Sequence, residues 1–198
     1  MSSLPSNITG VILVGGKSRR MGQDKTLLPV AGIPIVKRLI DCLQGCFQHL
    51  LLVGDQPERF ASYGVSIVPD IYPGSSLGGL YTGLKSVTTE QIFVTSCDIP
   101  FPSPDLIKLI CRQADSFDAV IPATKNGLEP LFARYDQSAL PAMQAALEAG
   151  NYRITSVLEQ LKILRIESDL LRTVDPDGRS LLNINTPYEY AACGELSA

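Results

Sequence analysis

The stretch ITGVILVGGKSRRMGQDK, residues 8–25, joins a short apolar run to a basic, glycine-rich segment. Residues 8–14 are apolar and rich in β-branched side chains, which is typical of a strand buried on both faces of a parallel sheet. Gly15 and Gly16 follow directly, so we expect the strand to end in a tight loop where the backbone can approach a ligand closely. The stretch predicts a parallel α/β fold with a ligand-binding loop after its first strand.

The same loop carries a cluster of four cations: Lys17, Arg19, Arg20 and Lys25. Backbone N–H groups from the glycines and these cations together suit phosphate oxygens, and a triphosphate is the natural occupant. A bare Gly-Gly pair would be read as a solvated turn, but the cations favour the phosphate site. The loop is neither G-x-G-x-x-G nor G-x-x-x-x-G-K-[ST], because Gly15 and Gly16 are adjacent and Gly22 is not followed by Lys-Ser or Lys-Thr.

Short apolar strands alternate with amphipathic helices along the rest of the chain. The predicted strands are 8–14, 49–53, 66–68, 91–95, 119–121 and 131–135, and the predicted helical segments are 34–46, 57–62, 77–87, 104–114, 140–149 and 155–161. This rhythm predicts a Rossmann-like three-layer α/β/α sandwich with a mostly parallel sheet. Ligands of such sheets bind beyond the carboxyl ends of the strands, where Gly54, Asp70 and Asp98 are expected.

Bulk composition limits the classes of function. The 198 residues fit one domain, 1–198, with 1–7 expected to be a flexible lead. A formal net charge of −3 argues against a nucleic-acid partner and against an anionic membrane surface. The N-terminus lacks a signal-peptide pattern, and no apolar run approaches the ~20 residues of a membrane span. We therefore expect a cytoplasmic location.

The five cysteines are scattered and odd in number, so neither a disulfide framework nor a zinc knuckle is indicated. Cys42 and Cys46 would share a helix face and are interpreted as core residues. The single histidine, His49, has no indicated partner, so a nucleophilic triad is not expected. Three arginines could meet an anionic substrate but are read more simply as solvated charges: Arg134, Arg153 and Arg179.

Asp98 lies in Cys97-Asp98-Ile99-Pro100, directly after a predicted strand. Mg²⁺ prefers one or two carboxylates together with substrate phosphates and water, so Asp98 is the predicted metal ligand. The alternative is that Asp98 caps the following helix. Ser103 lies closer to that helix start and is the better candidate for the cap.

The loop from Leu13 to Lys25 resembles the signature of the molybdenum cofactor guanylyltransferases, L-A-G-G-x-S-x-R-M-G-x-D-K, with Val14 at the alanine position. Later segments support the resemblance in the expected order: 73–84, a glycine-rich second loop; 97–100; and 183–187, Asn-Ile-Asn-Thr-Pro. These matching segments are spread along nearly the whole chain. The second loop reads Ser76-Leu77-Gly78 where the family usually has G-P-L, so it lacks that proline.

The resemblance implies a nucleotide-diphospho-sugar transferase-like fold and transfer of GMP from GTP to the terminal phosphate of molybdopterin, with Mg²⁺ as cofactor. Acceptor molybdoenzymes or their chaperones are further implied partners. The implied catalytic residues are Arg19, Lys25 and Asp98, with Asp98 holding the metal. The implied nucleotide-binding residues are Leu13, Val14, Gly15, Gly16, Lys25, Gly54, Asp70 and Asp98.

Two of these positions, and a pair near the C-terminus, keep alternative interpretations. Asp70 resembles a base- or ribose-contacting aspartate of the family, yet its Pro-Asp-x-Tyr-Pro-Gly context also suits turn chemistry. Gly54 could contribute only its backbone. Asn183 and Asn185 flank Ile184 on a predicted short strand and would bind the pterin substrate, although Asn185 could instead cap the helix that begins at Thr186-Pro187.

Three other functions remain open from the sequence. Gly15 favours GTP, because cytidylyltransferase relatives tend to have Ala-Gly in place of Gly-Gly. A sugar-phosphate nucleotidyltransferase is the nearest other enzyme. A non-catalytic carrier of pterin or nucleotide, with Asp98 as a helix cap, is the alternative from another class.

Overall fold

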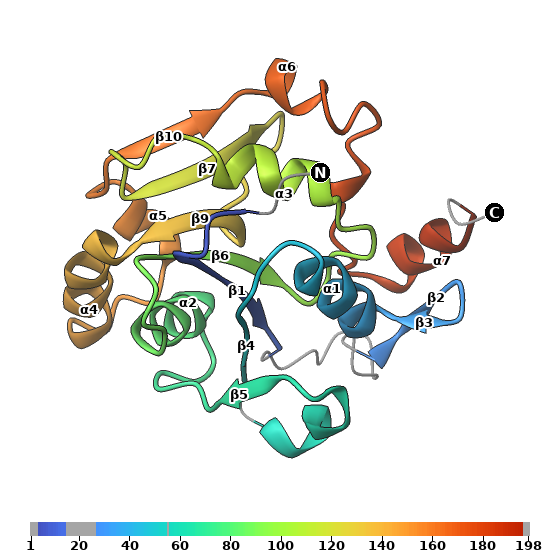
Figure 1. Ribbon diagram of the computed structural model, residues 1–198, viewed down its shortest axis with the longest axis horizontal. Helices are drawn as coiled ribbons and strands as arrows, with labels where there is room; N and C mark the ends of the chain where they lie inside the picture. Colours follow the sequence, from blue (N-terminus) through green and yellow to red (C-terminus); the bar gives the residue numbers. More distant parts are fainter. Residues whose placement is uncertain (1–3, 15–26, 55, 196–198) are drawn as a thin grey trace.

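The computed structural model describes residues 4–14, 27–54 and 56–195 and shows a central sheet between two layers of helices (Figure 1). The strand order is β10-β7-β9-β6-β1-β4-β5, and β8 pairs with β7. The strands are β1 Ile8–Leu13, β4 Leu50–Val53, β5 Ser66–Val68, β6 Gln91–Ser96, β7 Ala119–Thr124, β8 Gly127–Leu128, β9 Phe132–Asp136 and β10 Ile163–Ile166.

Most neighbouring strands run parallel. β1 is parallel to both β4 and β6, β4 is parallel to β5, and β7 is parallel to β10. Among the described strands of this sheet, β9 and β8 run opposite to the others: β9 is antiparallel to β6 and β7, and β8 is antiparallel to β7. The predicted mostly parallel sheet is confirmed, with one reversed strand inserted between β6 and β7.

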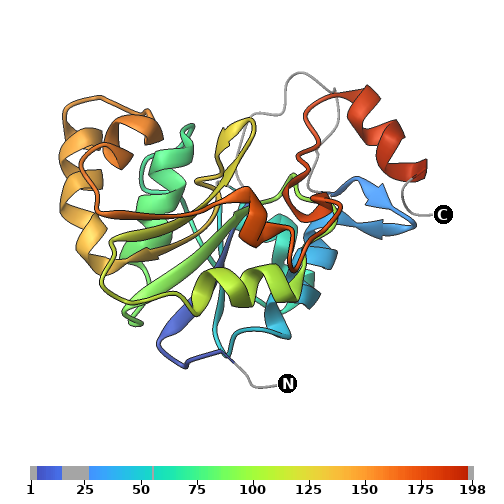
Figure 2. The ribbon, with the colours of Figure 1, turned by 90° about the horizontal axis from the view of Figure 1, so that it is seen from above.

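Helices cover both faces of the sheet (Figure 2). One face packs against α1, Ile35–Gln44, and α3, Pro104–Cys111; the other packs against α2, Ser76–Lys85, α4, Leu140–Glu148, and α5, Ile154–Leu158. Side chains of β1 alternate between the two cores, since Ile8 and Ile12 lie with α1 and α3 while Val11 and Leu13 lie with α2. The three-layer α/β/α architecture is confirmed.

The second glycine-rich segment forms the start of α2 without the family's proline. Ser75 caps the helix, because its hydroxyl accepts a hydrogen bond from the Gly78 N–H at 2.9 Å. Ser76 is the first helical residue, and Leu77 is the second. Gly78 is required by space, since a Cβ atom would lie 2.1 Å from the carbonyl oxygen of Tyr72.

Several short elements lie outside the predicted rhythm. A hairpin of β2, Pro29–Val30, and β3, Ile33–Pro34, turns through Ala31 and Gly32 with φ of 49° and 77°. Two-residue strands are too short to show a hydrophobic period, and β10 is a partly exposed edge strand. The remaining elements are η2 Pro57–Tyr63, η3 Gln137–Ala139, η4 Arg179–Leu181, α6 Ser168–Leu171 and α7 Pro187–Glu195.

The described part of the N-terminal lead packs on the fold. Leu4 is buried, and the Asn7 side-chain amide donates to Glu90 at 3.2 Å. Within the described ranges, no helix combines the length and the hydrophobicity that crossing a membrane requires.

Arg134 on β9 is fully buried, so its interpretation as a solvated charge is wrong. Its guanidinium donates to the carbonyl oxygens of Cys111, Gln113 and Ala114 at 3.3, 2.8 and 2.7 Å, and it pairs with Asp115 at 3.2 Å. These carbonyls belong to the C-terminal end of α3 and the residues just after it, where backbone oxygens lack partners within the helix. Arg134 therefore ties α3 to the sheet.

Replacing Arg134 with alanine should lower the free energy of unfolding by about 3 kcal/mol, because buried carbonyls and a packed side chain lose their partner. Urea unfolding measures the change. The matched control is Arg153→Ala, since Arg153 is exposed and its removal should change stability by less than about 0.5 kcal/mol. Equal effects of the two substitutions would contradict this role for Arg134.

Candidate functional site

The carboxyl ends of three neighbouring strands meet at one edge of the sheet. Leu13 at the end of β1 is in register with Val53 at the end of β4 and with Ser96 at the end of β6. The chain leaves β1 toward β4 and later returns to β6 on the other side of β1, so this edge is a topological switch point. The loops that follow β1 and β6 therefore start side by side.

Four predicted site residues lie in 15–26, outside the described residues: Gly15, Gly16, Arg19 and Lys25. The described chain ends its first segment at Val14 and resumes at Leu27. Leu13 and Val14 are each 7% exposed, so their side chains belong to the core. The Val14 N–H donates to the Val53 carbonyl at 2.8 Å and extends the β1–β4 pairing.

Gly54 and Asp70 follow β4 and β5 at the same edge. The Gly54 N–H donates to the Val68 carbonyl at 3.1 Å, so it links the two strands. The Asp70 carboxylate oxygen Oδ1 accepts from the Tyr72 N–H and from the Thr82 hydroxyl, each at 2.9 Å. Asp70 is thus part of a turn that is fixed to α2, and the residue is half-buried.

Asp98 lies in the turn that directly follows β6. Its carboxylate accepts from the Ser96 hydroxyl at 2.5 Å and is half-buried. The N-cap of α3 is Ser103, whose hydroxyl accepts from the Leu106 N–H at 3.3 Å. The alternative in which Asp98 caps this helix is therefore wrong, and the carboxylate stays at the sheet edge.

The segment 183–185 lies against the Asp98 turn. The Ile184 N–H donates to the backbone carbonyl of Asp98 at 2.9 Å, and the Ile184 side chain is buried. The predicted short strand is wrong, because this backbone bond is to a turn and residues 182–185 form no strand. The bond nevertheless brings the backbone at Asn183 and Asn185 beside the turn that holds Asp98.

Thr186, not Asn185, caps α7. The Thr186 hydroxyl accepts from the Glu189 N–H at 3.2 Å, and the Glu189 carboxylate accepts from the backbone N–H groups of Asn185 and Thr186 at 2.6 and 2.8 Å. This is a capping box, and the Thr-x-x-Glu spacing could have identified it from the sequence. Asn185 contributes only a backbone donor to the cap, and its side chain is exposed.

Glu129, between β8 and β9, joins this group although sequence reasoning did not single it out. Burial raises the pKa of the Glu129 carboxyl, hydrogen bonds from Thr124 and Asn183 lower it, and the nearby charge of Asp98 raises it. The available sequence signal was an acidic residue just before the predicted strand 131–135. Glu129, Asp98 and Asn183 thus come together from three separate loops.

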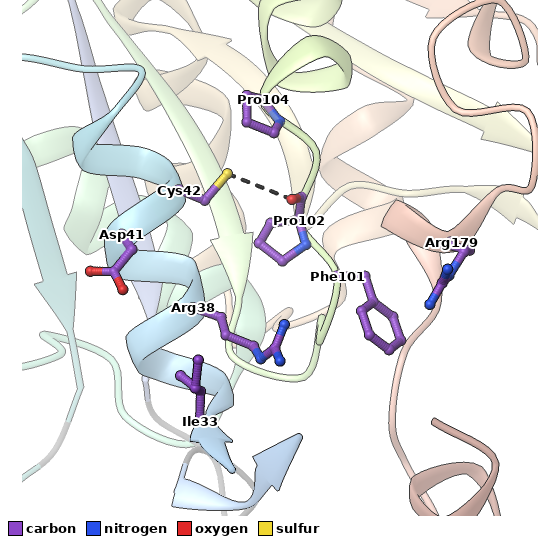
Figure 3. A pocket seen from close by; sticks show the side chains of 8 residues that line it. All are labelled: Ile33, Arg38, Asp41, Cys42, Phe101, Pro102, Pro104 and Arg179. Atoms are coloured by element: carbon purple, nitrogen blue, oxygen red, sulfur yellow. Dashed lines mark hydrogen bonds between the residues drawn. The ribbon is translucent and has the colours of Figure 1, made fainter. Parts of the chain in front are cut away.

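An open pocket of about 520 Å³ lies between α1, the loop after Asp98 and η4. Figure 3 shows Arg38 on the α1 side, Arg179 on the opposite side and Phe101 between them. The Arg179 guanidinium lies over the Phe101 ring, 4.6 Å from its centroid, and the Cys42 thiol donates to the Pro102 carbonyl at 3.7 Å. The residues predicted for the nucleotide and metal sites are absent from its described lining.

The chemistry of the sheet edge suits a hard cation. Its side chains offer carboxylate oxygens from Asp98 and Glu129 and amide groups from Asn183 and Asn185. Across the described ranges, no group of three or more His, Cys, Asp or Glu residues is arranged to hold a metal ion.

Comparisons with known proteins agree with this geometry. Residues 10–164 match the family model described as MobA-like NTP transferase domain. A probable molybdenum cofactor guanylyltransferase from Natranaerobius thermophilus is 35% identical, and the match covers 94% of each chain. A crystal structure of molybdopterin-guanine dinucleotide biosynthesis protein A from Archaeoglobus fulgidus superposes with a TM-score of 0.86 at 27% identity and covers 95% of this chain and 97% of that one.

A structure of Rv0371C from Mycobacterium tuberculosis in complex with manganese shares the fold, with a TM-score of 0.67 at 19% identity over 95% of this chain and 98% of that one. The predicted nucleotide-diphospho-sugar transferase-like fold and the resemblance to the molybdenum cofactor guanylyltransferases are confirmed. The family model spans most of the sheet, including β1, β6 and the turn that holds Asp98. The chain belongs to the MobA-like NTP transferase family.

Proposed function

We propose that the protein transfers GMP from GTP to the terminal phosphate of molybdopterin. An oxygen of the acceptor phosphate attacks the α-phosphorus of GTP, the bond from that phosphorus to the β-phosphate bridging oxygen breaks, and pyrophosphate leaves. The product is molybdopterin guanine dinucleotide. The names of the relatives support guanylyl transfer, and the family membership supports a nucleoside triphosphate as donor.

One structural observation carries the site assignment: the in-register pairing of β1 with β6. It places Leu13, at the end of β1, beside Ser96 at the start of the turn that holds Asp98. On this basis we propose that cations of residues 15–25 and the Asp98 carboxylate act on the same triphosphate. Lys25 and Arg19 would offset charge on the α-phosphate and on the leaving pyrophosphate. The acceptor phosphate is itself the nucleophile, so the reaction needs positioning and charge neutralisation more than a general base.

A divalent cation, Mg²⁺ in our proposal, would be held by Asp98 together with the triphosphate. When bound, such an ion supplies charge neutralisation and orientation for phosphoryl transfer. The Ser96 hydroxyl fixes one carboxylate oxygen of Asp98, which leaves the carboxylate in a set orientation at the cleft edge. Asp70, held by Thr82 and the turn, would contact the ribose or base, and the Asn183–Asn185 segment would contact the acceptor.

The setting we propose for this reaction is the cytoplasm. All five cysteines are free thiols, which suits a reducing compartment. Molybdoenzymes or their chaperones would receive the dinucleotide product.

Incubation with Mg²⁺, molybdopterin and GTP should release pyrophosphate and form the guanine dinucleotide, because the family and its relatives act on GTP. Pyrophosphate release and mass analysis of the product measure the reaction. The same incubations with CTP, and with sugar phosphates in place of molybdopterin, are the controls. Turnover with CTP but not with GTP, or turnover with sugar phosphates as acceptors, would contradict the assignment. Binding of GTP without release of pyrophosphate would favour a carrier.

Asp98→Asn should lower kcat by about 10²–10³-fold while the protein remains folded, because an amide cannot supply the negative charge that a cation needs. Initial rates over a Mg²⁺ titration measure the loss, and circular dichroism checks the fold. Asp105→Asn is a matched control, since Asp105 is a mostly exposed acidic residue in the first turn of α3. An Asp98→Asn variant as active as Asp105→Asn would show that Asp98 is not the metal ligand.

A further inference from the structure

The Asp70 carboxylate is held through one of its two oxygens. Oδ1 accepts hydrogen bonds from the Tyr72 N–H and from the Thr82 hydroxyl, each at 2.9 Å. An ionised carboxylate has about two acceptor sites on each oxygen, so these two donors fill the sites of Oδ1. A further donor that a ligand brings to this carboxylate is therefore received by Oδ2.

The direction of the hydrogen bond between Thr82 and Asp70 follows from a third group. The Ile71 N–H lies 3.0 Å from the Thr82 hydroxyl oxygen, and a backbone N–H can only donate. The Thr82 oxygen accepts there, and its single proton goes to Asp70. Thr82 is 1% exposed on α2, so water does not replace either bond. Together with the Tyr72 N–H, the buried hydroxyl fixes the orientation of the carboxylate.

The other carboxylate oxygen lies near the end of β1. A Cβ atom placed on Gly79 would lie 3.7 Å from Asp70 Oδ2 and 3.4 Å from both δ-methyl carbons of Leu13. Oδ2 and the last side chain of β1 therefore border the same space above Gly79, which contributes no side chain to cover the oxygen. This is the edge at which the proposed nucleotide site begins.

We propose that Thr82 is a positioning residue for the nucleotide: its hydroxyl holds Asp70 so that Oδ2 alone accepts a hydrogen bond from the nucleoside part of GTP. The proposal rests on the proposed function, which makes the ligand GTP. The nucleoside offers O–H donors on the ribose and N–H donors on guanine. One carboxylate oxygen receives one of these donors, so Asp70 does not pair with two guanine N–H groups through two oxygens. Thr82 acts through Asp70 and does not itself contact the nucleotide.

The first test compares Thr82→Val with Thr82→Ser. Valine keeps the branched shape but removes the hydroxyl, so the Asp70 carboxylate can rotate and GTP binding should weaken about 10-fold. Serine keeps the hydroxyl and should bind GTP within about 3-fold of wild type. Titration calorimetry with GTP and Mg²⁺, without molybdopterin, measures binding. In turnover, Thr82→Val should raise the KM for GTP and leave kcat and the KM for molybdopterin within about 2-fold of wild type.

Thr9→Val is the matched control for the loss of a buried hydroxyl. Thr9 is 4% exposed, and its hydroxyl lies 2.8 Å from that of Thr89 near the amino end of β1, away from the proposed site. Thr9→Val and Thr82→Val should both lower the midpoint of thermal unfolding, because each removes a buried hydrogen bond. Only Thr82→Val should weaken GTP binding.

A double-mutant cycle with Asp70→Ala tests whether Thr82 acts through Asp70. The double variant Thr82→Val/Asp70→Ala should bind GTP no more weakly than Asp70→Ala alone, because both changes remove the same contact chain. Analogues that lack or block one donor each then identify the group that Oδ2 receives: 2′-deoxy-GTP and 3′-deoxy-GTP for the ribose, and ITP and 1-methyl-GTP for the base. The loss caused by Thr82→Val should disappear with one analogue and persist with the others.

Four results would overturn the proposal. A Thr82→Ser variant as weak as Thr82→Val would show that the hydroxyl is not what matters. Additive losses in the double variant would show that Thr82 acts independently of Asp70. A Thr82→Val loss that persists with every analogue would place the contact outside the nucleoside, and one that disappears with both base analogues would indicate pairing through two oxygens.

Failure of the proposed function is distinguishable from these results. Wild-type protein that binds GTP without transferring GMP would contradict the proposed function alone, because the comparison of variants measures only binding. Wild-type protein that does not bind GTP would contradict both proposals.

Discussion

Six paired positions hold β1 beside β6, from Ile8 against Gln91 to Leu13 against Ser96. The strands are parallel, so their last residues lie at the same edge and the loops after them start as neighbours. A shift of one residue would turn every β1 side chain to the opposite face and would exchange the two cores, so burial on both faces makes the register strict. The core therefore fixes the position of the end of β1 relative to the turn that holds Asp98.

The second half of the chain completes this edge through backbone bonds and not through regular structure. The bond from Ile184 to the Asp98 carbonyl attaches the C-terminal segment to the β6 turn, and the capping box of Thr186 and Glu189 then starts α7. Glu129 lies in the link between β8 and β9. The edge formed by β1, β4 and β6 is built from parallel strands, whereas residues 183–185 reach it through these loop contacts.

The sequence predicted the part of the fold that follows hydrophobic periodicity. The strands 8–14, 49–53 and 66–68 and the helix 34–46 agree with the structure to within a few residues, because each buries one continuous apolar pattern. The position of Asp98 at a strand end followed from the same pattern. Hairpin β2–β3 and edge strand β10 were missed because short or half-exposed strands carry little periodic signal.

The residues whose environment the sequence did not predict, at the site and in the core, have a common physical cause. Arg134 is charged and its side chain is interpreted from the sequence as solvated, yet backbone carbonyls at and just after the end of α3 accept its hydrogen bonds and make a buried position favourable. Glu129 was missed, and residues 183–185 were read as a strand, because their contacts are with residues far away in sequence. Tertiary hydrogen bonds between loops leave no periodic trace, so only the structure could bring these residues together.

The most direct test of the central claim is a crystal structure with GTP and Mn²⁺, in which anomalous scattering locates the metal. The account predicts a metal peak at coordination distance from the Asp98 carboxylate, with the triphosphate lying between Asp98 and residues 15–25. A triphosphate bound away from the shared end of β1 and β6, or a metal without contact to Asp98, would contradict it.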